Sequence, residues 1–138
     1  MPLRDAIGWL GFGPHSRDTA LASLAAVNRR DWAQLRALLA DDFFYLDGEE
    51  NRIESADRFI AALRGLVRDA PDFRVDIDSF EDAGRMVFMR GRTVSSDARF
   101  RSRSMWRTKV ERGRLVCLEN FRPGSNNLRL GRYAPEHA

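Results

Sequence analysis

The stretch VNRRDWAQLRALLADDFFYLD, residues 27–47, contains the change from helix to strand that decides the fold. Asp31 precedes an apolar repeat with helical spacing, so it is predicted to cap a helix. The repeat consists of Trp32, Leu35, Leu38 and Leu39. The aromatic run that follows predicts a short strand over 43–46, and the sequence DGEE then predicts a turn into a return strand, NRI.

Two further helices are expected around this stretch. The first starts near Ser16 or Asp18, after a lead-in over 1–15 that glycine and proline interrupt. The other is capped by Ser55 and has an apolar stripe that suits a core-facing helix. Its stripe consists of Phe59, Ile60, Leu63, Leu66 and Val67.

After Pro71 the apolar residues alternate with a period of two, which predicts strands. We expect them near 73–78, 85–95, 99–110 and 114–122, joined by short turns. Helices segregated from such a sheet define an α+β fold, here one domain over 16–123 with a polar tail over 124–138. One face of the sheet would be buried by the helices, and the other would meet solvent or a partner.

The composition is that of an ordinary globular domain, with a mild net charge of +3. Cys117 is the single cysteine, so we expect a reducing compartment and assign the protein to the cytoplasm. The apolar stretch AIGWLGFG is too short to span a membrane and lacks a clear cleavage site, so neither a membrane partner nor a signal peptide is expected. His15 and His137 have no second ligand at metal spacing, so no metal is expected.

The order of elements, with residues 27–47 in place, resembles the nuclear transport factor 2-like superfamily, which includes ketosteroid isomerases and SnoaL-like polyketide cyclases. The resemblance runs from about Thr19 to Arg122. It implies a cone, in which a curved mixed or antiparallel sheet wraps around three helices from the first half of the chain. It also implies a pocket inside the cone and a homodimer formed through the outer sheet face.

The resemblance further implies a catalytic set. In isomerase-like members an aspartate five residues after the second aspartate of the DD doublet is the proton-transferring base, and here that position is Asp47. The family's oxyanion donors are a tyrosine of the first helix and a neutral aspartate of a late strand; these positions hold Ser23 and Ser104. Both replacements argue against a steroid isomerase in the strict sense.

Each candidate also has a purely structural explanation. Asp47 precedes glycine and could serve only the turn; as a base, it would need an apolar surrounding that takes part of its hydration away. Ser104 and Trp106 share the strand face expected to point inward, where they could line the pocket or simply belong to the core.

The last strand offers two alternatives. In the first, the alternating residues Leu118, Asn120 and Arg122 point toward the pocket, where Arg122 would suit a carboxylate-bearing ligand. In the second, a bulge exchanges the inward-facing and outward-facing residues of the strand, so that Glu119 points inward as a rival acid.

A row of arginines lies on the outward face of the strand over 99–110, namely Arg99, Arg101, Arg103 and Arg107. Such a row could follow phosphates, but no aromatic residues alternate with it for base stacking. Asp76 and Asp78 lie on the corresponding face of a neighbouring strand. We therefore expect a solvated or dimer-facing surface with cross-strand ion pairs, and no nucleic acid.

Two functions follow from the sequence. The first is a cofactor-independent enzyme that isomerises, cyclises or dehydrates a small apolar or aromatic molecule, with Asp47 as base and Ser104, Ser23 or Asn120 as oxyanion donor. Its predicted substrate-binding residues are Tyr45, Phe59, Trp106, Leu118, Asn120 and Arg122. The second is a ligand-binding or protein-interaction module of the same fold that catalyses nothing.

Overall fold

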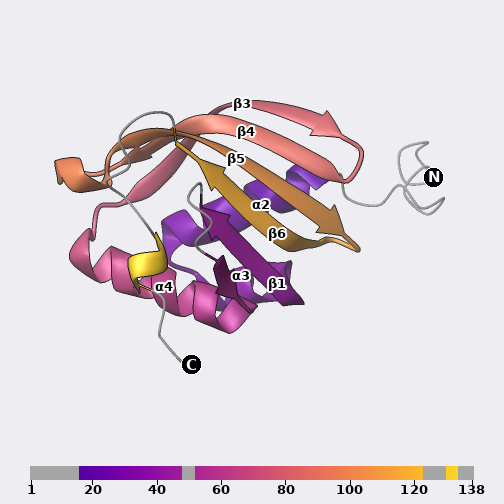
Figure 1. The fold of residues 1–138 in the computed structure, drawn as a ribbon, viewed down its shortest axis with the longest axis horizontal. Coiled ribbons are helices and arrows are strands. Elements are labelled where there is room, and N and C mark those ends of the chain that lie inside the picture. Colours follow the sequence, from indigo (N-terminus) through magenta and orange to yellow (C-terminus); the bar gives the residue numbers. More distant parts are fainter. Residues whose placement is uncertain (1–15, 48–51, 123–129, 134–138) are drawn as a thin grey trace.

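The computed structural model describes residues 16–47, 52–122 and 130–133. Its helices are α2 (Ser16–Arg29), α3 (Trp32–Leu38) and α4 (Ala56–Asp69), and all three pack on a single sheet (Figure 1). The strands are β1 (Leu39–Asp47), β2 (Arg52–Glu54), β3 (Arg74–Ala83), β4 (Met86–Val94), β5 (Ser102–Glu111) and β6 (Arg114–Phe121). The predicted α+β class is confirmed. The lead-in over 1–15, the turn after Asp47, the two histidines and most of the tail lie outside the described residues.

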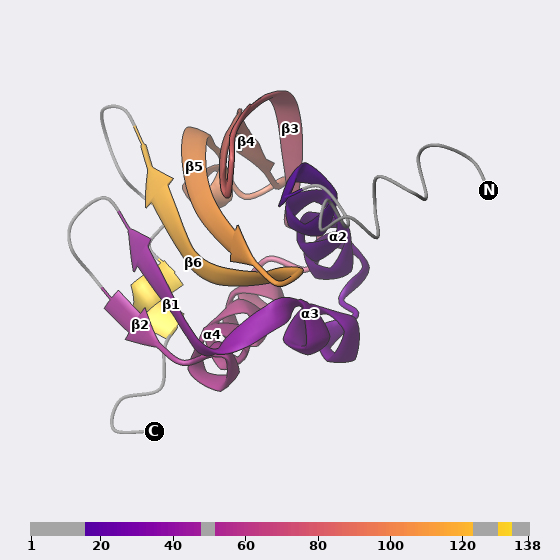
Figure 2. The same ribbon diagram turned by 90° about the vertical axis from the view of Figure 1, so that its right-hand side faces the viewer.

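The six strands form one mixed sheet in the order β2-β1-β6-β5-β4-β3. Neighbouring strands are antiparallel except β1 and β6, which run parallel. The sheet curves around the helices (Figure 2). We call the face toward the helices the concave face and the opposite face the outer face.

Asp31 and Ser55 cap helices, as the sequence predicted. The Asp31 carboxylate accepts a hydrogen bond from the backbone N–H of Gln34 at 3.1 Å, and the Ser55 hydroxyl accepts one from the backbone N–H of Arg58 at 3.2 Å. Asn28 adds a contact between α2 and the sheet, because its side-chain amide pairs with the backbone of Val75 in both directions, at 2.9 and 3.0 Å. This pairing fixes the end of α2 against the start of β3.

The boundary between α3 and β1 differs from the prediction. Leu39, expected in the helix, begins β1 and pairs with Leu115, so the strand starts four residues earlier than position 43. Its side chain is fully buried, which satisfies the apolar pattern equally well in either conformation. Similarly, β5 starts at Ser102, because Asp97 accepts a hydrogen bond from the Arg99 amide and caps a short 3₁₀ helix over 98–100.

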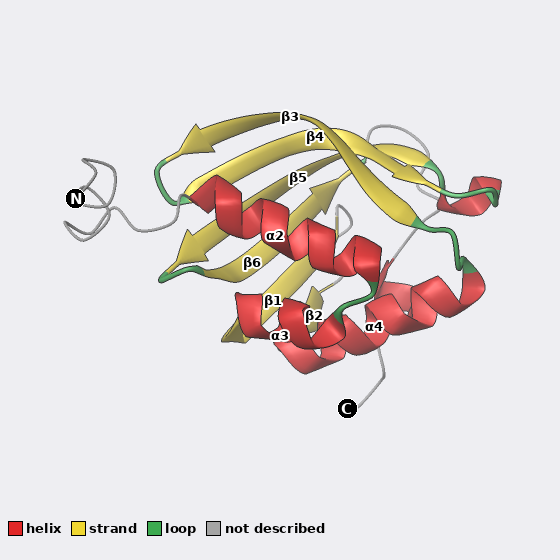
Figure 3. Ribbon diagram, turned by 180° about the vertical axis from the view of Figure 1, so that it is seen from behind, coloured by secondary structure: helices red, strands yellow, loops and turns green. Residues whose placement is uncertain are grey.

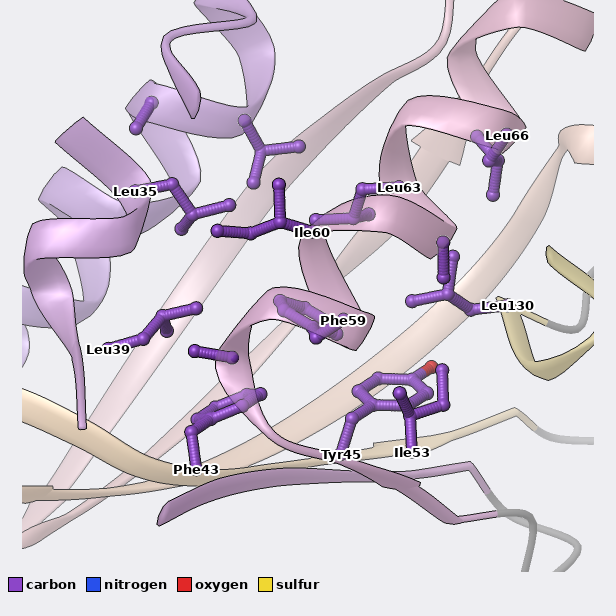
Figure 4. Packing of buried hydrophobic residues seen from close by; sticks show 14 of the residues in the cluster. Leu35, Leu39, Phe43, Tyr45, Ile53, Phe59, Ile60, Leu63, Leu66 and Leu130 are labelled. Atoms are coloured by element: carbon purple, nitrogen blue, oxygen red, sulfur yellow. The ribbon is translucent and has the colours of Figure 1, made fainter. Parts of the chain in front are cut away.

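Two apolar clusters fill the space between the helices and the concave face. The larger lies between α3, α4 and the β1–β2 hairpin, and its labelled members include Leu35, Phe43, Phe59 and Leu63 (Figure 4). The smaller consists of Ala20, Val87, Met89 and Trp106, where α2 crosses the sheet (Figure 3). Val75 and Leu118 contact both clusters, so the two form a continuous layer.

Part of the tail that we expected to be polar is packed. Residues 130–133 form a 3₁₀ turn against α4, with Leu130 buried in the larger cluster. The Tyr133 hydroxyl donates a hydrogen bond to Asp69 at 2.8 Å, which ties the turn to the end of α4. Isolated apolar residues in a polar segment are weak sequence signals, which is why the pattern alone did not reveal this contact.

Candidate functional site

The candidate site lies at the edge of the sheet where β1 and β6 end. Because these strands are parallel, their carboxyl ends meet, and Asp47 is the ladder partner of Asn120. β5 runs antiparallel to β6, so its first half lies at the same edge, with Trp106 paired to Asn120. Residues far apart in the chain thus form one row, Asp47–Asn120–Trp106, on the concave face.

Asp47 is buried on the concave face, with 4% of its surface exposed. It shares this face with Phe43 and Tyr45, since alternate residues of a strand point the same way. A turn-only role would not require the carboxylate to be shielded from water. The burial meets the condition set by the proton-transfer hypothesis, while the role itself stays a prediction.

Tyr45 places a hydroxyl on the same face of β1 as this carboxylate. Its ring stacks on Phe59 of α4, with ring centroids 5.3 Å apart (Figure 4). Burial raises the pKa of Tyr45 above its usual value; Asp47 adds to this effect, whereas the charge of Arg122 and a hydrogen bond from its guanidinium oppose it. Both charged groups are therefore close enough to the phenol to influence its ionisation, and the phenol stays protonated at neutral pH.

Asn120 faces the concave side, as the first alternative for the last strand predicted, and is only 1% exposed. Its side-chain amide nitrogen donates a hydrogen bond to the Met105 carbonyl at 3.2 Å. Its side-chain oxygen has no hydrogen-bond partner among the described residues. A buried amide oxygen without a partner is uncommon and calls for an explanation such as a bound water or ligand.

Glu119 is on the outer face and pairs with Arg107 at 2.6 Å, so the alternative with an inward Glu119 is wrong. A bulge does occur, between the pairs Lys109–Cys117 and Val110–Leu115, but it precedes Leu118 in β6. It lets Leu115 join the larger apolar cluster without changing the inward direction of Leu118 and Asn120.

Both candidate serines are buried, and their hydroxyls have partners inside the protein. Ser23 lies on the sheet-facing side of α2 and donates to the Thr19 carbonyl at 2.9 Å. The Ser104 hydroxyl is 3.2 Å from that of Ser102, and either oxygen can be the donor in this pair. Ser104 is therefore the more available donor of the two.

The remaining predicted residues occupy the same side of the sheet. Trp106 and Leu118 contribute apolar surface next to Asn120, and Phe59 supports Tyr45 from α4. The sequence had suggested Tyr45 only as a pocket wall. Its alternation with Asp47 along one strand could have indicated that both polar groups face the same space.

The outer face has a different character. Its middle exposes three large apolar side chains, Phe88, Met105 and Phe121, around a pocket of about 400 Å³. Of the predicted arginine row, Arg107 has a cross-strand ion pair, to Glu119, whereas Arg99 pairs with the nearby Asp97. Arg103 instead lies opposite Arg92. The cross-strand neutralisation expected from Asp76 and Asp78 is therefore incomplete, since Asp76 binds Arg74 on its own strand.

Among the described residues, no three His, Cys, Asp or Glu side chains are grouped so that they could hold a metal ion. Within the same ranges, every helix is too short or too polar to cross a bilayer.

Comparison with known proteins gives a consistent picture. A proposed ketosteroid isomerase from Kribbella flavida is 21% identical, with a TM-score of 0.67 over 80% of this chain and 79% of that one. An LEH-like epoxide hydrolase from M. tuberculosis is also 21% identical, with a TM-score of 0.67 over 78% and 81%. A proposed SnoaL-like polyketide cyclase from Shewanella denitrificans is 17% identical, with a TM-score of 0.69 over 78% and 90%. At these identities the similarity establishes the fold.

No curated protein matches the sequence significantly. The sequence model of the SnoaL-like domain, in contrast, matches residues 20–118, which is more than half of the chain. That range includes all three helices except the first turn of α2, and it ends at Leu118 in β6. The chain therefore belongs to the SnoaL-like domain family, within the nuclear transport factor 2-like superfamily.

Proposed function

We propose that this chain binds a small apolar or aromatic molecule on the concave side of its sheet and catalyses proton transfer with Asp47 as the base. The observation that carries the proposal is the burial of Asp47 next to Asn120 at the edge where β1 and β6 end. The reaction class is isomerisation, cyclisation or dehydration, and no cofactor is needed for it.

The chemistry requires a base and a donor to the oxygen on which charge develops. Asp47 would remove a proton from a carbon next to a carbonyl, and the enolate oxygen would then need a hydrogen bond. The Asn120 amide group has two N–H bonds and uses one for the Met105 carbonyl, so its second can serve the ligand. The Ser104 hydroxyl is the alternative donor, and Ser23 is the least available because the Thr19 carbonyl takes its proton.

Apolar surface next to these groups supports the choice of ligand. Trp106 lies opposite Asn120 on the neighbouring strand β5, and Leu118 precedes Asn120 by two residues on β6 itself. Tyr45 and Phe59 form an aromatic wall. Arg122 beside the Tyr45 hydroxyl would suit a ligand with one negatively charged group. The similar structures named above as an isomerase, a hydrolase and a cyclase are consistent with small-molecule chemistry on this fold.

We also propose a homodimer that buries the exposed apolar residues of the outer face, and cytoplasmic localisation because Cys117 is the single cysteine. The proposed dimer is based on surface chemistry, and the proposed localisation is based on composition.

The test is proton exchange measured by NMR in heavy water, with a panel of cyclic and aromatic ketones that can form enolates. The protein should accelerate deuterium incorporation next to the carbonyl, and Asp47→Asn should reduce that acceleration by about 100-fold or more. Glu119→Gln is the matched control, since it neutralises an outward carboxylate, and it should leave the exchange rate unchanged.

Equal rates for Asp47→Asn and the unaltered protein would remove Asp47 from the mechanism. The non-catalytic module remains the second candidate, because the serine hydroxyls already have partners inside the protein. It would be favoured if ketones raise the melting temperature, if Trp106→Ala abolishes that increase, and if no exchange occurs.

A further inference from the structure

A second pocket lies on the outer face, at the end of the sheet where β3 and β5 begin and β4 ends. Its volume is about 390 Å³, and four arginines line it: Arg74 of β3, Arg92 of β4, Arg103 of β5 and Arg101, which immediately precedes β5. Asp76 is the one carboxylate among the lining residues. Four cations and one anion leave a formal charge of +3 in the lining, equal to the net charge of the whole chain.

The arrangement of these charges is unfavourable without an occupant. Arg92 and Arg103 are direct ladder partners on β4 and β5, and like charges placed opposite one another destabilise a sheet. Neither arginine has an ion pair among the described residues. Asp76 is the ladder partner of Arg92 on the other side, but its oxygens bind the guanidinium of Arg74, at 3.0 and 3.2 Å.

We propose that this pocket binds a small multivalent oxyanion of the phosphate or diphosphate type. A tetrahedral oxyanion presents oxygens in several directions and can accept hydrogen bonds from two or more guanidinium groups at once. A single carboxylate is satisfied by one guanidinium fork, so it matches a site with several arginines less well. The anion would bridge Arg92 and Arg103 and remove their mutual repulsion.

The surroundings favour a small ligand over nucleic acid. Val94 is the one large apolar residue of the lining, so no aromatic platform for base stacking lies beside the arginines. Farther along the outer face Glu81 and Glu119 interrupt the positive charge, which would oppose an extended phosphate backbone.

Calorimetric titration of the full chain with inorganic pyrophosphate tests the site. We expect saturable binding that Arg92→Gln and Arg103→Gln each weaken about tenfold or more, since each removes a charge-assisted contact. Arg114→Gln removes an equal charge from an exposed position at the opposite end of the β5–β6 hairpin, and it should change the affinity less than about twofold. Citrate should bind more weakly than pyrophosphate.

Folding is checked in the same samples. Arg92 and Arg103 are exposed. Their variants should therefore melt at the same temperature as the unaltered protein, or higher, when no anion is present. Pyrophosphate should raise the melting temperature of the unaltered protein and of Arg114→Gln more than that of the pocket variants.

Any one of the following outcomes would overturn the proposal. They are absence of saturable pyrophosphate binding, equal weakening by all three substitutions, citrate binding as tight as pyrophosphate, and binding of a DNA duplex in place of pyrophosphate that the pocket substitutions abolish. A dimer that Arg92→Gln or Arg103→Gln dissociates, without pyrophosphate binding, would assign the pocket to a subunit contact and would also overturn it.

Discussion

At the scale of single residues, Tyr45 and Asp47 determine the character of the candidate site. They are two positions apart on β1, so both point to the concave face. The phenol accepts a hydrogen bond from Arg122 and is affected by the charge of Asp47. A tyrosine that stays neutral in such a place can donate its own proton to a ligand, which gives it more than the wall-forming role that its aromatic ring suggests.

The raised pKa of Tyr45 predicts a specific loss of stability at alkaline pH. An unfolded tyrosine loses its proton near pH 10, about where free tyrosine titrates, whereas the buried Tyr45 keeps it to higher pH. Stability that is present below about pH 10 is therefore lost as the pH rises above it, by up to about 1.4 kcal/mol per pH unit. Tyr45→Phe should cost about 1 kcal/mol at neutral pH, through loss of the Arg122 hydrogen bond, but should show a shallower alkaline decline.

Urea unfolding over a series of alkaline pH values measures both effects. Tyr133 and Lys109 are present in both proteins, so their titration cancels in the comparison. Identical slopes for Tyr45→Phe and the unaltered protein would show that Tyr45 is not protected from ionisation.

At the scale of elements, a glycine inside β4 allows β3 and β4 to approach each other closely. Gly91 is buried, and a β-carbon added to it would overlap the Asp76 carbonyl oxygen of β3. The ladder between β3 and β4 shifts register just beyond this contact, between Ile77 and Ser79. Glycine in a strand interior often marks such a close approach of two backbones. The local geometry of the β3–β4 pair therefore depends on the missing side chain.

Gly91→Ala should destabilise the protein by about 3 kcal/mol, the upper end of the usual cost of overpacking, because backbone atoms cannot move aside as a flexible side chain can. Gly84→Ala is the control: it lies in the β3–β4 turn with φ +64° and open space around it, so it should cost only about 1 kcal/mol. Thermal or urea unfolding measures both. A cost for Gly91→Ala no larger than for Gly84→Ala would contradict the close approach.

At the scale of the whole molecule, the two faces of the sheet serve different purposes. The helices cover the concave face, and the buried Asp47 and Asn120 lie side by side on it where β1 and β6 end. The outer face carries an apolar centre of Phe88, Met105 and Phe121 with the arginine pocket at one end. An exposed apolar group rimmed by charged residues is typical of a protein contact, which is the basis of the proposed dimer.

Met105→Asp should convert the proposed dimer to a monomer, because it places a charge at the centre of the apolar group, where Met105 is 43% exposed in the single chain. Light scattering coupled to size exclusion measures the mass. Leu21→Asp introduces the same charge at a 37% exposed leucine of α2 and should leave the dimer intact. A monomeric mass for the unaltered protein, or equal effects of the two substitutions, would contradict a dimer through the outer face.

The sequence alone determined those features that depend on residues close together in the chain. Asp31 and Ser55 cap helices because their side chains reach amides three residues ahead. The alternation in β5 correctly placed Ser104 and Trp106 on the buried side. The resemblance to a family, drawn from residues 27–47, correctly indicated the curved sheet and its covering helices. Such patterns are local, so they survive without knowledge of the fold.

Only the tertiary structure decided which segments lie side by side. The parallel pairing of β1 with β6 brings Asp47 next to Asn120, and no pattern within either segment encodes that partner. The register of the β5–β6 bulge settled the direction of Glu119, and the surface of α4 determined that Leu130 is buried. Periodicity reports which residues share a face, whereas pairing and register depend on packing between segments that are distant in the chain.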